Sequence, residues 1–229
     1  RYMHQNIKVK EYVSYMEKIK AVIFDMDGVL IDSEPSNLRQ LYDFYKEYGF
    51  VADAAFLISL VGSSLEYTWR VSIEKMNKDW SQDEFYEHFD AYAKEHMVSY
   101  RDILNSSVKE TLVWLRAHGY HTAIGSSSTL MNIKRMLKEC ELEGLFDLVF
   151  SGEMFHESKP NPEIYLTIAK QLQVEPKHCM VIEDSTFGIE AGKRAGMRTI
   201  ALQDTKFSID QSQADEMISK IADIQKLLA

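Results

Sequence analysis

The stretch Ile-Lys-Ala-Val-Ile-Phe-Asp-Met-Asp-Gly-Val-Leu-Ile-Asp-Ser-Glu, residues 19–34, decides how the rest of the chain is arranged. Its apolar run at 21–24 is typical of a fully buried strand. The run ends at Asp25, Asp27 follows two positions later, and Gly28 lets the chain turn without a steric penalty. Two carboxylates just past the carboxyl end of a buried strand lie where open α/β sheets bind ligands. Because carboxylates are costly to desolvate, the pair indicates a metal ion or proton chemistry, with a solvated acidic turn as the alternative.

The composition is that of an ordinary globular protein. The chain has 229 residues, of which 45% are hydrophobic and 27% charged, enough for one large domain or for a core with an inserted lobe. A net charge of -9 without a Lys/Arg cluster argues against nucleic acid or an anionic membrane as a partner. Cys140 and Cys179 form neither a disulfide framework nor a metal knuckle. With no apolar run of membrane-spanning length and no signal-peptide pattern, we expect a cytoplasmic monomer.

The hydrophobic pattern predicts an α/β core that is interrupted by a helical insertion. Leu38, Leu41 and Tyr45 recur at helical spacing, and Ser81 with Glu84 has the pattern of a capping box. The aromatic residues of this insertion are interpreted as its own core. The predicted boundaries are an N-terminal extension at 1–15, a catalytic core at 16–34 and 100–229, and an all-helical cap of about four helices at 35–99.

Helices and strands alternate after residue 105. Short apolar runs predict strands at 120–125, 146–150, 179–182 and 197–202, with helices between them and a last helix from about residue 212. Strands that alternate with helices indicate a doubly wound parallel sheet, so the predicted fold is a Rossmann-like α/β core that carries a helical cap.

Polar residues follow several of the predicted strands. Asp25 and Ser126 each end an apolar run, Glu183 and Asp184 follow another, and Lys159 comes shortly after the third strand. Alone, each has an ordinary explanation as a surface lysine, a turn serine or the acidic start of a helix. Parallel strands bring all of these ends to one edge, where carboxylates suit Mg²⁺ and the lysine and hydroxyl suit a phosphate.

These motifs resemble the haloacid dehalogenase-like hydrolase superfamily, in the branch with a helical cap, and within it the β-phosphoglucomutase-like phosphatases. The resemblance extends over about residues 18–202. It is carried by the stretch at 25–34, by Ser126, by Lys159-Pro-Asn-Pro-Glu-Ile-Tyr, and by Glu183-Asp-Ser-Thr-Phe-Gly-Ile-Glu-Ala-Gly. It implies a Mg²⁺-dependent phosphomonoester hydrolase whose substrate is a small phosphorylated metabolite, such as a sugar phosphate.

The resemblance also implies roles for individual residues. Asp25 would attack phosphorus to form an aspartyl-phosphate, and Asp27 would serve as general acid and then as general base. Mg²⁺ would be held by Asp25, by the backbone carbonyl of Asp27 and by Asp184, with Glu183 as a ligand or acting through water. Ser126 and Lys159 would hold the phosphoryl group that is transferred.

Two alternatives remain open at this stage. The mutase branch carries a cap histidine and a cap arginine that grips a second phosphate, and the corresponding positions here are Asn37 and Leu65, which favours a phosphatase. A receiver-type signalling switch also uses Asp, Ser/Thr and Lys at strand ends, but the helical insertion and Asp27 argue against it. The candidates for substrate specificity are Asn37, Gly62, Ser63, Ser64 and Arg70.

Overall fold

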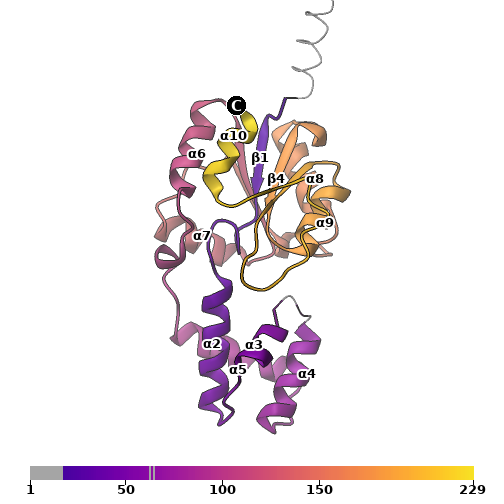
Figure 1. Ribbon diagram of the computed structural model, residues 1–229. Coiled ribbons are helices and arrows are strands. Elements are labelled where there is room, and N and C mark those ends of the chain that lie inside the picture. The colour runs from indigo at the N-terminus through magenta and orange to yellow at the C-terminus, as the bar shows by residue number, and fades with distance from the viewer. Residues whose placement is uncertain (1–17, 62, 64) are drawn as a thin grey trace, which may run out of the picture.

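The computed structural model describes residues 18–61, 63 and 65–229 (Figure 1). The predicted extension at 1–15 and the specificity candidates Gly62 and Ser64 therefore lie outside the described residues. The core is a six-stranded sheet in the order β3-β2-β1-β4-β5-β6, and every pair of neighbouring strands is parallel. The strands are β1 (Ala21–Phe24), β2 (His121–Ser126), β3 (Leu148–Ser151), β4 (Cys179–Glu183), β5 (Arg198–Leu202) and β6 (Glu216–Ile218).

The first strand lies in the middle of the sheet because all four of its side chains are apolar. None of them has any exposed surface, and β1 pairs in parallel with β2 on one side and β4 on the other. Phe24 is aligned with Ile124 and Ile182, so the residues that follow these three positions come out together at the carboxyl edge. This register confirms the predicted convergence of strand ends.

Helices cover both faces of the sheet, as the alternation of strand residues requires. Val22 and Phe24 pack into a cluster with α6 (Val108–Ala117), α7 (Leu130–Glu139) and α10 (Ile224–Leu228). Ala21 and Ile23 pack into a second cluster with α8 (Glu163–Leu172) and α9 (Thr186–Arg194). The two helical layers lie on opposite sides of β1 and β4 in Figure 1. The predicted doubly wound parallel fold is confirmed.

Four helices form a separate lobe with an aromatic core. They are α2 (Glu34–Glu47), α3 (Ala54–Ser59), α4 (Leu65–Met76) and α5 (Gln82–Glu95), which lie below the sheet in Figure 1. Phe44, Tyr45 and Phe85 are completely buried in this lobe, which we call the cap. The predicted capping box is present, because Ser81 accepts from Glu84 N while Glu84 accepts from Ser81 N. The aromatic residues are thus the cap's own core, as expected.

Two backbone segments connect the cap to the core, and they run side by side. The first passes through Asp32, whose N–H donates to the carbonyl of Ile103 in the second at 2.8 Å. The second, residues 97–104, includes a short 3₁₀ turn at Tyr100–Ile103. It is followed by Asn105, whose N–H donates to Leu30 O at 2.9 Å. No helix among the described residues is long and apolar enough to cross a membrane.

The C-terminal tail differs from the sequence prediction. Instead of a helix from about residue 212, the chain forms strand β6 before the short helix α10. Strand β5 would otherwise expose unpaired backbone groups, and the tail satisfies them. Asp215 contributes on both sides of this contact: its carboxylate accepts from Thr199 N and its own N–H donates to Thr199 O, both at 2.8 Å.

Candidate active site

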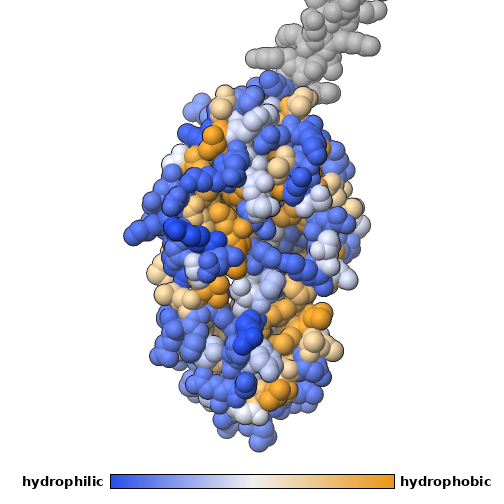
Figure 2. All heavy atoms as spheres, turned by 60° about the vertical axis from the view of Figure 1, so that its left-hand side comes forward, coloured by the Kyte–Doolittle hydropathy of each residue, from blue (hydrophilic) through white to orange (hydrophobic). Residues whose placement is uncertain are grey.

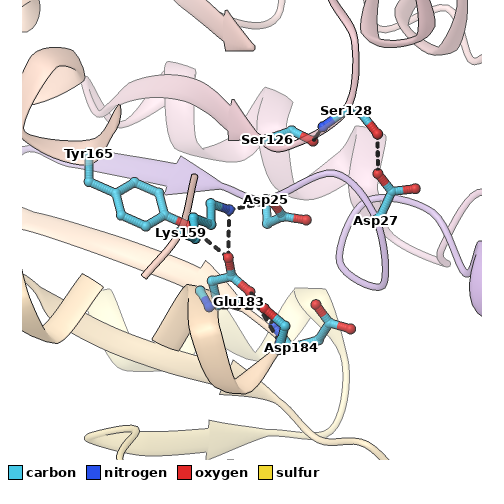
Figure 3. A network of polar contacts seen from close by, with 10 residues as sticks. Asp25, Asp27, Ser126, Ser128, Lys159, Tyr165, Glu183 and Asp184 are labelled. Carbon is cyan, nitrogen blue, oxygen red and sulfur yellow. Dashed lines mark hydrogen bonds and ion pairs between the residues drawn. The ribbon is translucent and has the colours of Figure 1, made fainter. Parts of the chain in front are cut away.

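The side chains at the carboxyl edge of the sheet form one buried polar network (Figure 3). Lys159 Nζ donates to Asp25 Oδ1 at 2.6 Å and to Glu183 Oε1 at 2.7 Å. The Lys159 side chain is only 6% exposed, and the carboxylates of Asp25 and Glu183 are 10% and 1% exposed. Burial alone would lower the pKa of Lys159, but the two carboxylates outweigh it and raise that pKa well above its usual value. Lys159 is therefore a fixed cation beside Asp25.

Glu183 is an anchor for this part of the network. Its Oε1 accepts from Lys159 and from the hydroxyl of Tyr165 at 2.8 Å, while its Oε2 accepts from Asp184 N, Ser185 N and Ser185 Oγ. Burial raises the pKa of Glu183, but Lys159 and these donors reverse the effect and lower it. A Cβ on Gly188 would lie 1.7 Å from Glu183 Oε1, so only glycine allows α9 to start over this carboxylate.

Asp184 lies against the turn that follows β1. A Cβ on Gly28 would come within 1.9 Å of Asp184 Oδ2, and Gly28 has a φ of +75°, so that this position requires glycine on both grounds. Burial, followed by the negative charges of Glu183 and Asp25, raises the pKa of Asp184 to about 9. Burial also raises the pKa of Asp25 to about 7, since Lys159 only partly offsets it and Glu183 and Asp27 add to it.

Burial is the largest cause of both raised pKa values, and the neighbouring carboxylates add to it. Asp25 and Asp184 are hard oxygen donors of the kind that Mg²⁺ prefers, so the residues fit a divalent cation. Among the described residues, however, no three His, Cys, Asp or Glu side chains are grouped closely enough to hold a metal ion by themselves. The two observations are compatible, because Mg²⁺ usually takes only one or two carboxylates and completes its shell with water, carbonyl oxygens and substrate phosphate.

Asp27 points away from this network and toward the loop after β2 (Figure 3). Ser128 Oγ donates to Asp27 Oδ2 at 2.6 Å, and Ser128 N donates to Ser126 Oγ at 3.1 Å. The loop is held in turn by Ser151, which donates to Ser128 O at 2.7 Å. Ser126 is buried, and its hydroxyl, which accepts from Ser128 N, can still donate its own proton to a ligand. Ser128 thus holds Asp27 in place, and both residues line a cavity between the core and the cap.

A cavity of about 870 Å³ separates the core from the cap at this point. One face of each of three helices lines it. Figure 2 shows the core above and the cap below it, with the boundary between the two lobes running across the molecule. Asp184 instead lines a smaller cavity of about 200 Å³ beside the loop that follows β5. The large cavity is lined by Asp27, Ser33, Glu34, Ser36, Asn37, Gln40, Asp90, Ala93, Lys94, Met97, Val98, Tyr100, Ile103, Ser128, Thr129, Met131, Asn132 and Arg135.

The predicted specificity candidates occupy different places. Asn37 lines the large cavity. Ser63 is hydrogen-bonded within the cap, to Leu60 O at 2.8 Å and to the Thr68 hydroxyl at 2.7 Å. Arg70 is exposed, lies 5.8 Å from the centre of the Tyr67 ring, and is not part of the cavity wall.

Several residues of the site were not singled out from the sequence. Ser128 is one of three consecutive serines, and only the structure shows which of them reaches Asp27. Tyr165 was noted only as the last residue of the Lys159 motif, six positions on, and its hydroxyl contact with Glu183 depends on how α8 packs under the sheet. Arg135 had no signal at all, because a charged residue in an amphipathic helix is ordinarily solvent-facing.

Comparisons with known proteins agree with this geometry. The family model described as haloacid dehalogenase-like hydrolase matches residues 22–202. The chain is 30% identical over 190 residues to a fructose-1-phosphate phosphatase from Escherichia coli, covering 80% of this chain and 96% of that protein. It is also 30% identical over 213 residues to a phosphoglycolate phosphatase from Aquifex aeolicus, covering 92% and 97%.

A solved structure and a longer relative complete the comparison. The structure of a HAD family hydrolase from Deinococcus radiodurans with bound phosphate and sodium superposes with a TM-score of 0.76 at 25% identity, covering 93% of this chain and 96% of that one. The chain spans only 18% of the chloroplastic protein SUPPRESSOR OF QUENCHING 1 from Arabidopsis thaliana, at 31% identity over 196 residues. With the match to the family model extending over most of its length, this chain belongs to the haloacid dehalogenase-like hydrolase family.

Proposed function

We propose that the protein is a Mg²⁺-dependent phosphatase that hydrolyses the phosphate monoester of a small polyhydroxylated metabolite through an aspartyl-phosphate. The observation that carries the proposal is the pairing of Asp25 with Lys159 at the end of β1, with Asp184 close by. A carboxylate beside a fixed cation and a second carboxylate is the arrangement that nucleophilic attack on a phosphoryl group requires.

The first step is attack by Asp25 on phosphorus. Lys159 donates to Oδ1 of Asp25, and no hydrogen bond to Oδ2 is recorded within the described part of the chain, so Oδ2 is the oxygen available for attack. A new Oδ2–P bond forms while the bond from phosphorus to the substrate oxygen breaks. Lys159 and the hydroxyl of Ser126 hold the oxygens of the phosphoryl group during this transfer.

Asp27 handles the protons of both steps. Its carboxyl group protonates the leaving oxygen of the substrate, and the carboxylate that results removes a proton from the water that attacks the aspartyl-phosphate. Water then releases phosphate and regenerates Asp25. The hydrogen bond from Ser128 keeps Asp27 facing the cavity, where the substrate alcohol leaves.

The proposed metal ligands are the carboxylates of Asp25 and Asp184 and the backbone carbonyl of Asp27. A bound Mg²⁺ would supply positive charge that offsets the negative charge of the phosphoryl oxygens. The same charge would lower the raised pKa values of Asp25 and Asp184. Glu183 would act through water or by holding Lys159, since both of its oxygens already accept hydrogen bonds.

The lining of the large cavity supports a polyhydroxylated substrate. Most polar groups in its wall are hydroxyls and amides, which form hydrogen bonds with sugar hydroxyls in either direction. The cationic groups Lys94 and Arg135 are matched by acidic groups such as Glu34 and Asp90 in the same wall, so the wall has no surplus of positive charge for a second phosphate. Two relatives are named for small phosphate monoesters, fructose 1-phosphate and phosphoglycolate, and the first of these is polyhydroxylated.

A panel of phosphorylated metabolites tests the proposal. Fructose 1-phosphate, hexitol phosphates, phosphoglycolate and nucleoside monophosphates are each incubated with the protein and Mg²⁺, and free phosphate is measured. Asp25→Asn serves as the matched control, because amide and carboxylate have nearly the same shape. The proposal expects phosphate release by the wild type and none by Asp25→Asn. Equal release by both proteins would overturn it.

A further inference from the structure

One corner of the large cavity is built by a contact between helix α7 of the core and the second segment that connects to the cap, residues 97–104. Arg135 is the centre of this contact. It donates through Nη1 to Met97 Sδ at 2.8 Å and through Nη2 to Val98 O at 3.0 Å. Its guanidinium carbon lies 4.0 Å from the centre of the Tyr100 ring. A single side chain therefore contacts three of the four residues at the start of this segment.

Glu139 completes the contact one turn later on the same face of α7. Its carboxylate lies 3.2 Å from Arg135 Nε and accepts from Tyr100 N at 2.8 Å. Its carbonyl accepts from Arg101 Nε at 3.1 Å. Because each Nη atom bonds to the segment and the guanidinium lies on the Tyr100 ring, Arg135 is a fixed part of the wall.

The same residues line the cavity. Arg135, Met97, Val98 and Tyr100 all belong to its wall. Ser128, which contacts Asp27, lies two residues before α7 begins, and Arg135 lies in the second turn of that helix. The corner at Arg135 is thus a part of the cavity wall that lies next to the segment connecting the core to the cap.

We propose that Arg135, supported by Glu139, is a positioning residue that clamps the 97–104 segment to α7 and so fixes this part of the wall of the substrate cavity. This inference rests on the proposed phosphatase function only for its effect on substrates. Substrates large enough to contact this part of the wall depend on the clamp, whereas the smallest phosphate compounds, which contact only the catalytic residues, do not.

The first test measures the segment itself and needs no activity. Hydrogen–deuterium exchange is compared for wild type, Arg135→Met and Arg39→Met, where Arg39 is exposed and paired with Asp43 on the cap helix α2. Exchange in peptides covering 97–104 should rise by about fivefold or more in Arg135→Met, because local opening becomes easier, and stay at the wild-type rate in Arg39→Met. Exchange in β2 should not change. An unchanged rate in 97–104 would overturn the proposal.

The second test measures specificity with two probes of different length. For Arg135→Met, KM for fructose 1-phosphate should rise about tenfold with kcat within about twofold, while both constants for acetyl phosphate stay within about twofold. Equal losses on both probes would refute the clamp and indicate general damage. The KM of Arg135→Lys should lie between those of the wild type and Arg135→Met. An ammonium group cannot make both contacts with the 97–104 segment and also stack on Tyr100.

The two tests separate failure of the clamp from failure of the phosphatase proposal. If the wild type releases no phosphate from any probe, the phosphatase proposal fails and the exchange result alone decides the clamp. If Arg135→Met does not fold, Glu139→Gln replaces it, since it keeps the shape of the side chain but weakens the hold on Arg135. It should raise exchange in 97–104 in the same direction, and no rise would overturn the proposal.

Discussion

Removing divalent metal should make the stability of this protein fall as the pH rises. Burial and neighbouring carboxylates raise the pKa of Asp25 from 3.8 to about 7 and that of Asp184 from 3.8 to about 9. In the unfolded chain both groups lose their protons near pH 4, whereas the metal-free native state keeps them. Stability from these two protons is therefore complete at acid pH and is lost as the pH rises through the folded values.

The expected magnitude follows from the number of protons retained. Each retained proton lowers the free energy of unfolding by about 1.4 kcal/mol per pH unit, so two give a slope of up to about 2.7 kcal/mol per unit. The slope is best measured between about pH 5.5 and 7. Carboxylates with lowered pKa values, such as Glu183 and Asp204, make stability rise with pH, but they do so only below this range. Bound Mg²⁺ favours the charged forms of Asp25 and Asp184 and should flatten the slope.

Urea unfolding at several pH values, in chelator and in Mg²⁺, measures both slopes. Asp184→Asn is the control variant, because it removes one of the two titrating groups and should reduce the slope in chelator by about half. A slope in chelator that is zero or positive, or one that Mg²⁺ leaves unchanged, would refute the charge balance that we assign to this site.

Three further predictions concern the chemistry. Asp27→Ala should slow hydrolysis by about two to four orders of magnitude, with a smaller loss for substrates whose leaving group needs no proton; equal losses on good and poor leaving groups would instead indicate a structural role. Phosphate release should require Mg²⁺, stop with excess chelator and be inhibited by Ca²⁺, whose larger and irregular coordination shell would misplace the attacking oxygen; full activity in chelator would contradict the metal assignment. With β-glucose 1-phosphate and a trace of the 1,6-bisphosphate, any turnover should yield glucose and phosphate, because neither Asn37 nor Leu65 offers a cation; glucose 6-phosphate as the main product would show a mutase.

The parts of the fold set by local pattern could be predicted from the sequence. The apolar run before Asp25 and the alternation of helices and strands indicated a parallel sheet, and Ser81 with Glu84 marked the start of a cap helix. The last strand could not be predicted, because β6 is short and largely exposed. It forms only because β5 offers a free edge, which is a property of the assembled sheet.

The site residues divide in the same way. Asp25, Ser126, Lys159, Glu183 and Asp184 are tied to strand ends, so their convergence followed from topology. The contact of Ser128 with Asp27 depends on how the loops after β1 and β2 meet, and that of Arg135 with the 97–104 segment depends on which way α7 faces. Periodicity indicates that a helix has a polar face, but it does not indicate which segment packs against that face. Contacts at the boundary between the two lobes therefore cannot be predicted from the sequence.

The central claim is that Asp25 becomes phosphorylated during turnover, and trapping that intermediate tests it most directly. The protein is mixed with acetyl phosphate and Mg²⁺, quenched in denaturant within one turnover and reduced with borohydride, which converts an aspartyl-phosphate to homoserine. Mass spectrometry should find homoserine at position 25 in the wild type and at no other carboxylate, with none in Asp25→Asn. Phosphate release without homoserine at this position, or with homoserine at another aspartate, would contradict the account.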